Sequence, residues 1–276
     1  MATKRASKRS TTRRSNVKRV LNCVPSENTE KDWTPDEAKA AGALRAGRAA
    51  AAPASIDLRT GNSWYKIGDQ GATGSCVGWA SADSVVRWHF VKANRLASTK
   101  SLSVRYVWMA SKETDQFTQR PSTFIDAEGT SLKSALDVCR KWGTVEDTLL
   151  PFASGKLYPG TEGEFYAIAA TGRISAYFNL GTNPTAWKNW LSQNGPILTR
   201  LGVDATWDGA TGTNGNLDVY QPQTNRGGHA VALVGYTPDR FIVRNSWGTA
   251  WGDKGYAYAS YGYAQAAFTE AYGVTP

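Results

Sequence analysis

The sequence has few cysteines, few histidines and no long apolar run, and each shortage excludes a class of protein. Three cysteines and two histidines among 276 residues leave no close cluster of metal ligands, so we expect neither a metal nor a cofactor. The lack of a disulfide framework favours a cytoplasmic or other reducing compartment. No apolar run approaches the roughly 20 residues of a membrane-spanning helix, and no apolar segment follows the basic N-terminus as a secretory signal peptide requires.

The net charge of +9 is concentrated at one end of the chain. Residues 1–20 contain eight basic residues and no acidic one, which leaves 24 basic and 23 acidic residues for the remainder. We expect this stretch to be a disordered basic arm. Two interpretations of the arm stay open. It binds nucleic acid or another anionic surface, for example in a virion or on a nucleoid, or it is a solubilising, cleavable extension.

The segment that ends at Cys76 carries the strongest chemical signal. Gln70 lies six residues before the cysteine, and Gly71 and Gly74 between them let the backbone turn sharply. The residues after Cys76 are apolar on nearly every side, which predicts a buried helix that begins at the cysteine. A helix N-terminus favours the thiolate form of a cysteine. Gln70 is then the expected side-chain donor to an oxyanion that forms beside the sulfur.

A nucleophilic thiol needs a base, and only one of the two histidines is suitable. His89 lies 13 residues along the same predicted helix, roughly 20 Å away, so we expect it to be structural. His229 begins an apolar, β-branched run that a turn connects to a second run, which predicts an antiparallel hairpin. If the turn centres on Thr237, His229 faces Asn245 on the partner strand. Asn245 then orients the imidazole, and Trp247 covers the pair.

These motifs, in this order, resemble those of the papain-like cysteine peptidases. The resemblance extends from about residue 53 to 262 and rests on Gln70 and on residues 74–76, 228–231 and 245–248. Thr73 stands where many secreted members have a disulfide-bonded cysteine, Val77 where they have tryptophan, and Gly228 where Asp or Asn often precedes the histidine. The chain therefore resembles a bacterial- or virus-type member without the usual disulfides.

The resemblance implies an α+β fold of two halves with the active site in the groove between them. We expect residues 55–165 to be mainly helical and residues 166–276 to form an antiparallel, barrel-like β half. Residues 21–54 would be a leader and linker, either lying across the groove or flexible. A capping box predicts a short helix over residues 34–44 of this leader. Local patterns predict helices over 103–112, 131–141 and 183–195, strands over 172–178, 197–203, 230–236 and 241–245, and a long loop over 204–227.

The resemblance also implies hydrolysis of peptide bonds through a thioester acyl-enzyme, without a cofactor and by a monomer. Cys76, His229, Asn245 and Gln70 are the expected catalytic residues. The expected substrate-binding residues are Gly129, Gly228 and Trp247, although a glycine at a helix entry explains Gly129 equally well. Three alternatives remain: a transglutaminase or deamidase on the same scaffold, a non-catalytic binding protein, or a nucleic-acid-associated protein that depends on its basic arm.

The other two cysteines have different expected states. Cys139 belongs to the apolar stripe of a predicted amphipathic helix, so we expect a buried core thiol. Cys23 precedes the predicted catalytic domain. It is either an exposed, incidental thiol or a regulatory residue that pairs with Cys76.

Overall fold

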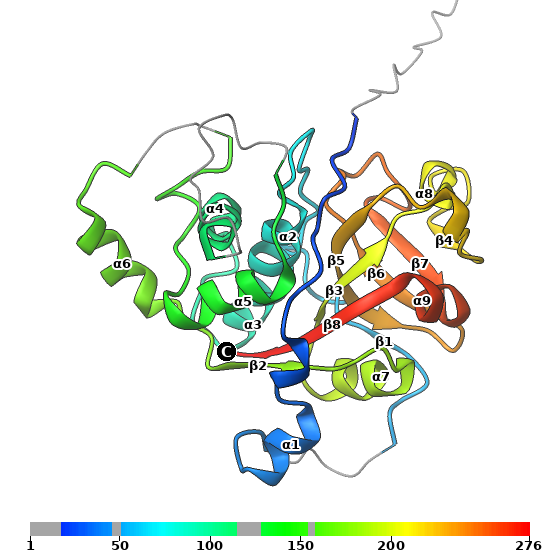
Figure 1. Ribbon diagram of the computed structural model, residues 1–276, viewed down its shortest axis with the longest axis horizontal. Helices are drawn as coiled ribbons and strands as arrows, with labels where there is room; N and C mark the ends of the chain where they lie inside the picture. Colours follow the sequence, from blue (N-terminus) through cyan, green and yellow to red (C-terminus); the bar gives the residue numbers. More distant parts are fainter. Residues whose placement is uncertain (1–17, 46–50, 115–127, 154–157) are drawn as a thin grey trace, which may run out of the picture.

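The computed structural model describes residues 18–45, 51–114, 128–153 and 158–276. In Figure 1 most helices gather on one side and a β-sheet lies on the other, with the first described residues running between them. The fold is thus α+β with two halves, as predicted. Residues 1–17 of the basic arm and residues 46–50 of the predicted linker lie outside the described residues, so binding of nucleic acid by the arm stays a prediction.

The helical half is built around one long rod that begins at Cys76. In this rod α2 (Cys76–Gly78), the π-helix η2 (Trp79–Val86) and α3 (Arg87–Lys92) follow one another without a break. The expected helix is therefore present, but its middle is wound more widely as a π-helix, a feature that is frequent at functional sites. The remaining helices of this half are α4 (Val104–Thr114), α5 (Leu132–Lys141) and α6 (Glu162–Thr171).

In the other half, the described residues form one sheet of eight strands. Its path is β2-β8-β3-β5-β6-β7-β4, and β1 pairs separately with β5. Adjacent strands are antiparallel except β4 and β7, which are parallel. The strands are β1 (Ile56–Asp57), β2 (Ala176–Asn179), β3 (Ile197–Gly202), β4 (Asn216–Leu217), β5 (Gly228–Tyr236), β6 (Arg240–Arg244), β7 (Tyr256–Ser260) and β8 (Phe268–Thr275). The described strands form an open sheet, so the predicted barrel-like closure is wrong: β2 and the two-residue β4 lie at the two ends of the path and do not pair with each other.

The remaining helices are short. Two of them precede the first strand in the chain, and the others lie between strands of the sheet. They are η1 (Thr29–Lys31), α1 (Pro35–Ala40), α7 (Pro184–Gln193), α8 (Thr206–Gly209), η3 (Pro222–Thr224) and α9 (Tyr261–Ala267). The predicted capping box is present at α1, where Thr34 and Glu37 bond reciprocally. No helix among the described residues is both long and apolar enough to cross a bilayer.

Two segments differ from their sequence-based predictions. The helix α6 extends to Thr171, past the expected boundary at residue 166, and the strand expected from residue 172 starts only at Ala176. Only Phe165 and Ala169 of α6 are buried, so its sequence shows no continuous apolar face that would identify a helix. The predicted loop 204–227 contains α8, β4 and η3.

The β5–β6 hairpin has a different register from the predicted one. Its pairs include Ala232 with Arg244 and Leu233 with Val243, two residues away from a hairpin centred on Thr237, and a bulge follows Leu233. Because a shift of two residues preserves the face on which each side chain lies, the predicted face of His229 is kept. Asn245 directly follows β6 and still reaches the histidine.

A buried ion pair joins the two halves. Arg244 of β6 is 2% exposed, and its guanidinium lies 2.7 Å from the Asp83 carboxylate on η2. Arg87 binds the other carboxylate oxygen at 3.2 Å, and the Arg244 guanidinium stacks over the Tyr65 ring at 4.3 Å. These contacts hold the cysteine-bearing rod against the histidine-bearing sheet.

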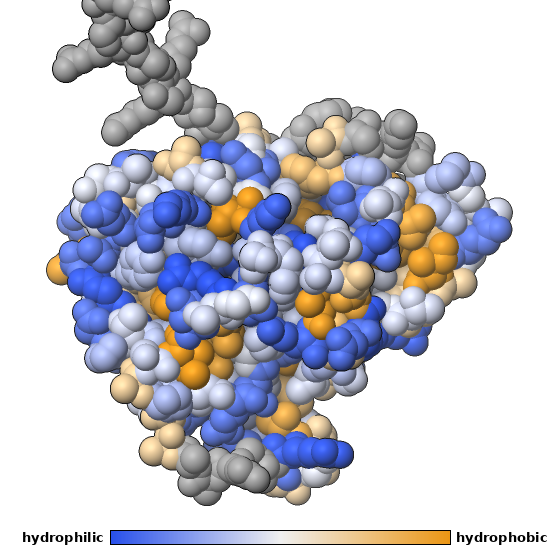
Figure 2. All heavy atoms as spheres, turned by 180° about the vertical axis from the view of Figure 1, so that it is seen from behind, coloured by the Kyte–Doolittle hydropathy of each residue, from blue (hydrophilic) through white to orange (hydrophobic). Residues whose placement is uncertain are grey.

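The outer surface has no single apolar side in the view from behind. Figure 2 shows hydrophilic residues interspersed with small apolar patches on that face. The large exposed apolar side chains of the described chain, Trp33, Trp142, Ile168 and Val219, are far apart in sequence. Isolated apolar residues of this kind are normal on a protein surface.

Candidate active site

Cys76 starts the central rod and faces the first residues of strand β5. Its side chain is fully buried and contacts the His229 ring and the backbone N–H of Ala230. A hydrogen bond from the Cys23 thiol, followed by these two contacts, lowers the pKa of the Cys76 thiol well below its ordinary value, although burial acts in the opposite direction. The site therefore favours a thiolate at Cys76.

His229 is held between Cys76 and Asn245. Its Nε2 lies 2.8 Å from Asn245 Oδ1, and the same oxygen accepts the backbone N–H of Ser246 at 2.8 Å. Since an oxygen with two donors acts as an acceptor, Nε2 carries a proton in this arrangement. The other nitrogen, Nδ1, has no hydrogen-bond partner besides the thiol it faces. The predicted pair of His229 and Asn245 thus lies together, on the side of the sheet that meets Cys76.

Tryptophans enclose the imidazole. The Trp247 ring lies 5.0 Å from the His229 ring at 35°, so it covers the histidine as expected. Trp207 meets His229 edge-on at 5.6 Å and stacks on Trp251 at 4.9 Å. Trp207 is fully buried, so it packs against the histidine and does not line an open pocket. The contribution of Trp251 was not predicted, although its position shortly after Trp247 was a usable signal.

Gln70 is fixed by hydrogen bonds at both ends of its side-chain amide. Its Oε1 accepts a hydrogen bond from Ser246 Oγ at 2.9 Å, and its Nε2 donates to the Thr73 carbonyl at 2.9 Å. An amide nitrogen has two hydrogens, so one of them remains available for another acceptor. Gln70 is fully buried, and its backbone N–H bonds the Ser246 carbonyl at 2.8 Å. The side chain and the backbone of Gln70 therefore both bind the residue that follows Asn245.

The groove between the halves is occupied by the leader. The backbone N–H of Cys23 donates to the Gly228 carbonyl at 3.0 Å, and that of Val24 donates to the Thr130 carbonyl at 3.2 Å. One hydrogen bond goes to each wall of the groove. A Cβ on Gly129 would lie 1.9 Å from the Asn22 carbonyl oxygen, and one on Gly228 would lie 2.2 Å from the Cys23 carbonyl oxygen. Both predicted substrate-binding glycines thus permit close approach of a main chain.

The basic residue Arg19 holds the leader at the cysteine end of the groove. Its guanidinium pairs with Asp69 at 2.6 Å and donates to the carbonyls of Gly71 and Trp247, each at 3.0 Å. It also lies over the Trp247 ring at 5.7 Å. Arg19, which belongs to the predicted basic arm, therefore contacts the segment before Cys76 and the residues after Asn245. Arg19 was missed because the sequence shows it only as one of eight clustered basic residues.

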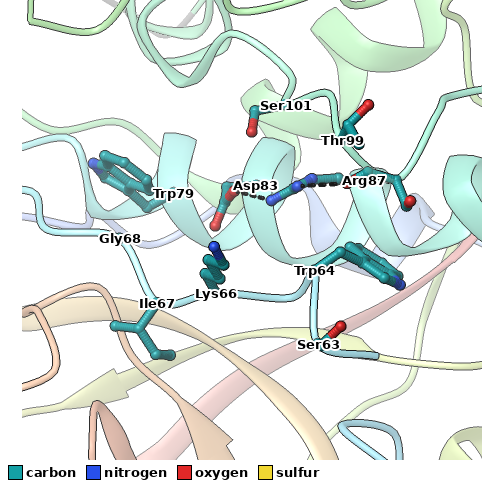
Figure 3. Close-up of a pocket in the computed structure, with 11 residues that line it drawn as sticks. Ser63, Trp64, Lys66, Ile67, Gly68, Trp79, Asp83, Arg87, Thr99 and Ser101 are labelled. Atoms are coloured by element: carbon teal, nitrogen blue, oxygen red, sulfur yellow. Dashed lines mark hydrogen bonds and ion pairs between the residues drawn. The ribbon is translucent and has the colours of Figure 1, made fainter. Parts of the chain in front are cut away.

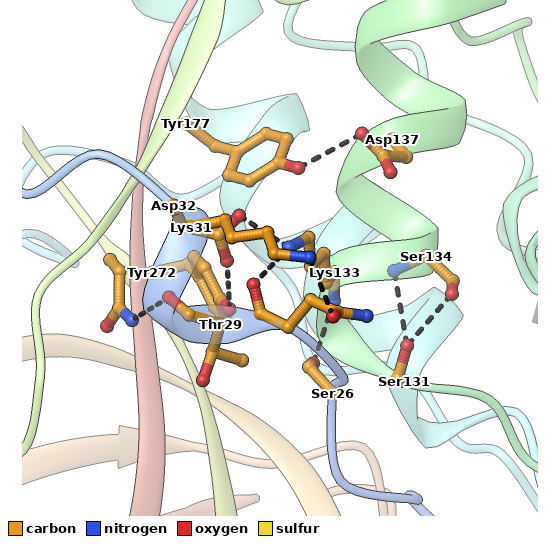
Figure 4. A network of polar contacts seen from close by, with 12 residues as sticks. Ser26, Thr29, Lys31, Asp32, Ser131, Lys133, Ser134, Asp137, Tyr177 and Tyr272 are labelled. Atoms are coloured by element: carbon orange, nitrogen blue, oxygen red, sulfur yellow. Dashed lines mark hydrogen bonds and ion pairs between the residues drawn. The ribbon is translucent and has the colours of Figure 1, made fainter.

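Further along, the leader is attached to both halves of the protein. Asp32 pairs with Lys133 of α5 at 2.6 Å and accepts a hydrogen bond from the Tyr272 hydroxyl of β8 at 2.8 Å. Lys133 also donates its backbone N–H to Ser26 Oγ at 3.1 Å. Figure 4 shows these groups converging where the leader crosses from the helices to the sheet.

A separate cavity lies on the central rod, away from the cysteine. It has a volume of about 650 Å³ and is lined by residues of the 63–68 segment, the η2–α3 part of the rod and the 98–101 turn. Figure 3 shows the Asp83–Arg87 ion pair at its wall between Trp64 and Trp79. Its lining includes neither Cys76 nor His229. Within the described residues, no group of three or more His, Cys, Asp or Glu side chains could hold a metal ion.

Comparisons with known proteins identify the family of the chain. The sequence profile of the papain family cysteine proteases matches residues 52–274. Cysteine proteinase 1 of Dictyostelium discoideum is 25% identical over 217 residues, which cover 75% of this chain and 60% of that protein. Cathepsin F of Drosophila melanogaster is 26% identical over 253 residues, covering 81% of this chain and 36% of that protein. The chain therefore spans less than two thirds of the length of these relatives.

A solved structure shares the fold over nearly the whole chain. Xylellain, a cysteine protease from Xylella fastidiosa, superposes with a TM-score of 0.72 at 21% identity, and the match covers 93% of this chain and 96% of that one. The profile match extends over most of the chain and includes Cys76, His229 and Asn245. The chain therefore belongs to the papain family of cysteine proteases.

Proposed function

We propose that the chain is a cysteine peptidase that hydrolyses peptide bonds with Cys76, His229 and Asn245. One observation carries the proposal: a buried thiol of lowered pKa contacts a histidine whose far nitrogen lies 2.8 Å from an asparagine oxygen. This is the arrangement of a nucleophile, a base and a group that orients the base. Family membership supports the same activity.

In the first half of the reaction, the Cys76 thiolate attacks the carbonyl carbon of the scissile peptide bond. The carbonyl oxygen becomes an oxyanion, which the free hydrogen of Gln70 Nε2 and the backbone N–H of Cys76 stabilise. His229 Nδ1 then gives its proton to the leaving amine as the carbon–nitrogen bond breaks. The products are a free amine and a thioester between the substrate acyl group and Cys76.

In the second half, water hydrolyses the thioester. His229 Nδ1 takes a proton from the water, and the resulting hydroxide attacks the thioester carbonyl. The same donors hold the oxyanion, and the carbon–sulfur bond breaks to release a carboxylic acid and the thiolate. The hydrogen bond to Asn245 keeps the ring in the required orientation, and Trp247 shields that bond from water.

We further propose that the leader inhibits this site. Residues 22–24 take the hydrogen bonds of Gly228 and Thr130 that an extended peptide substrate needs, and Cys76 is fully buried beneath them. A substrate must therefore displace the leader before it can reach the sulfur. The form described is then an inhibited precursor, and removal of the leader, or its release from the groove, activates it.

Covalent labelling combined with hydrolysis tests the proposed activity. We expect an epoxysuccinyl inhibitor to alkylate Cys76 in the activated protein and to stop hydrolysis of a fluorogenic peptide amide. Cys76→Ala should abolish both effects while leaving the fold intact, and Cys139→Ala, which removes a thiol in α5, should retain both. Near-normal turnover by Cys76→Ala would exclude the proposed nucleophile. Release of ammonia from glutamine substrates without peptide cleavage would favour the deamidase alternative.

A further inference from the structure

The structure buries a second thiol against the catalytic sulfur. Cys23 is 1% exposed and Cys76 is 0% exposed, and both belong to the same buried cluster. The prediction that Cys23 is an exposed, incidental thiol is therefore wrong. The Cys23 side chain instead interacts with the Cys76 sulfur, as the opposite shifts of the two thiol pKa values indicate, and its sulfur also lies 3.9 Å from the Val24 carbonyl oxygen, which can accept the thiol hydrogen.

The backbone around Cys23 is held from two directions. Its N–H donates to the carbonyl of Gly228, which is the residue directly before His229. Its carbonyl oxygen accepts a hydrogen bond from Arg200 Nε of β3 at 2.9 Å. With both main-chain groups bound, Cys23 keeps its position beside Cys76 as long as the leader occupies the groove.

The two thiols differ in their chemical state. Burial, and next the hydrogen bond to Cys76, raise the pKa of Cys23 well above its ordinary value, whereas the pKa of Cys76 is lowered. A neutral thiol thus faces a thiolate. Cys139 provides a contrast: it is buried in α5, and burial raises its pKa to about 12.

We propose that Cys23 is the resolving thiol of Cys76, so that a peroxide converts the pair into a disulfide that binds the leader covalently in the groove. The inference rests on the proposed role of Cys76 as a reactive thiolate. It assigns to Cys23 a reaction with an oxidant that peptide hydrolysis does not involve.

The chemistry proceeds in two balanced steps. The Cys76 thiolate attacks one oxygen of hydrogen peroxide, the oxygen–oxygen bond breaks, and protonation of the leaving hydroxide gives water and a sulfenic acid at Cys76. The Cys23 sulfur then attacks the sulfenic sulfur, and the displaced hydroxide takes the Cys23 proton to form a second water. The two cysteines lose two electrons in total, which reduce one peroxide to two waters.

The disulfide changes the control of the site. Because both sulfurs are buried, peroxide reaches Cys76 when the leader opens locally, and Cys23 returns to the sulfenic acid when the leader closes. The leader then cannot leave the groove until a thiol reductant cleaves the bond. The reaction also prevents further oxidation of Cys76 to the irreversible sulfinic acid.

The test treats the full chain with hydrogen peroxide and reads the products by mass spectrometry. We expect the intact mass to fall by two hydrogen atoms, a non-reducing digest to contain a peptide that joins Cys23 to Cys76, and dithiothreitol to restore the original mass. Cys139→Ala should give the same cross-link, since its missing thiol takes no part. Cys23→Ser and Cys23→Ala should instead accumulate a dimedone-reactive sulfenic acid at Cys76 and then a sulfinic acid that dithiothreitol does not reverse.

Several results would overturn the inference. One is oxidation of Cys76 to sulfinic acid in the unmodified chain as fast as in the two Cys23 variants, and another is a cross-link through Cys139. Two Cys23 variants are used so that one that fails to fold, as judged by circular dichroism, does not decide the result. Because the readout is a mass, a cross-link in a protein that hydrolyses no peptide would contradict the proposed function alone. Hydrolysis without a cross-link would contradict the inference alone.

Discussion

Substitution of Arg19 tests whether contacts of a single leader side chain keep the active site closed. Arg19→Ala removes an ion pair with Asp69, hydrogen bonds to the carbonyls of Gly71 and Trp247 and a stacking contact with the Trp247 ring. All of these contacts exist only while the leader lies in the groove. The substitution should therefore shift the leader toward its released state and leave the groove itself unchanged.

The size of this shift follows from the exposure of the contacts. The Asp69 side chain is 52% exposed, so the ion pair contributes at most about 1 kcal/mol. Hydrogen bonds from a charged donor contribute about 1.5 kcal/mol or more each, but the two carbonyls share one guanidinium and are not fully additive. We expect a total loss of about 2–3 kcal/mol, which corresponds to a roughly 30- to 150-fold rise in the ratio of released to bound leader.

The assay measures how fast the intact precursor exposes its thiol. We expect Arg19→Ala to raise both the rate of Cys76 alkylation by an epoxysuccinyl inhibitor and the initial rate of peptide hydrolysis by that factor. Lys18→Ala is the matched control, because it removes the neighbouring positive charge from an exposed residue. If Arg19→Ala and Lys18→Ala differ by less than about twofold in both rates, the contacts of Arg19 do not hold the leader and the reasoning is wrong.

Three further predictions concern the site and the core. Gln70→Ala should lower kcat of the activated enzyme by about 10²–10³, because it removes the side-chain oxyanion donor; steady-state kinetics within about twofold of the parent would exclude that role. Burial lowers the pKa of His89 to about 4, so below pH ~6.5 the unfolded chain binds a proton that the folded protein does not, and the free energy of unfolding should fall by about 3 kcal/mol between pH 7 and pH 4. Urea titrations of His89→Leu should show a loss of unfolding free energy on acidification that is smaller by about 3 kcal/mol. An equal loss in both proteins would contradict the role of His89. Arg244→Met leaves Asp83 with one partner and should lower the unfolding free energy by about 3–5 kcal/mol, whereas an unchanged urea midpoint would show that Arg87 neutralises Asp83 alone.

The residues that meet in the site were predictable because their local patterns are strong. Cys76 had to begin a helix, since the apolar residues that follow it leave no polar face. His229 and Asn245 were placed on one face by the period of a β-strand alone. The predicted register of their hairpin was two residues off, yet an even error does not move a side chain to the other face. A prediction of the face therefore survived an error in the prediction of the turn.

The leader was less predictable because its contacts are distant in sequence. Arg19 binds Asp69 and Trp247, which lie 50 and 228 residues away, and nothing in the basic run distinguishes it from its neighbours. Cys23 has no apolar periodicity around it, so its burial depends entirely on the groove that it fills. The open sheet was not predicted for a related reason. A closed barrel would require β2 to pair with β4, and the residues of these two strands do not indicate whether they pair.

The contacts of the leader also show which residues can be substituted to change its inhibition of the site without changing catalysis. The leader uses the Gly228 and Thr130 carbonyls, and an extended peptide substrate would use the same main-chain groups. A change in the walls of the groove therefore weakens leader and substrate together, and the balance between them moves little. Side chains of the leader are different, because substrates lack them. Arg19 sets the non-covalent part of this balance, and Cys23 adds a covalent part that depends on oxidant, so the two residues allow the closed state to respond to its surroundings while the groove stays the same.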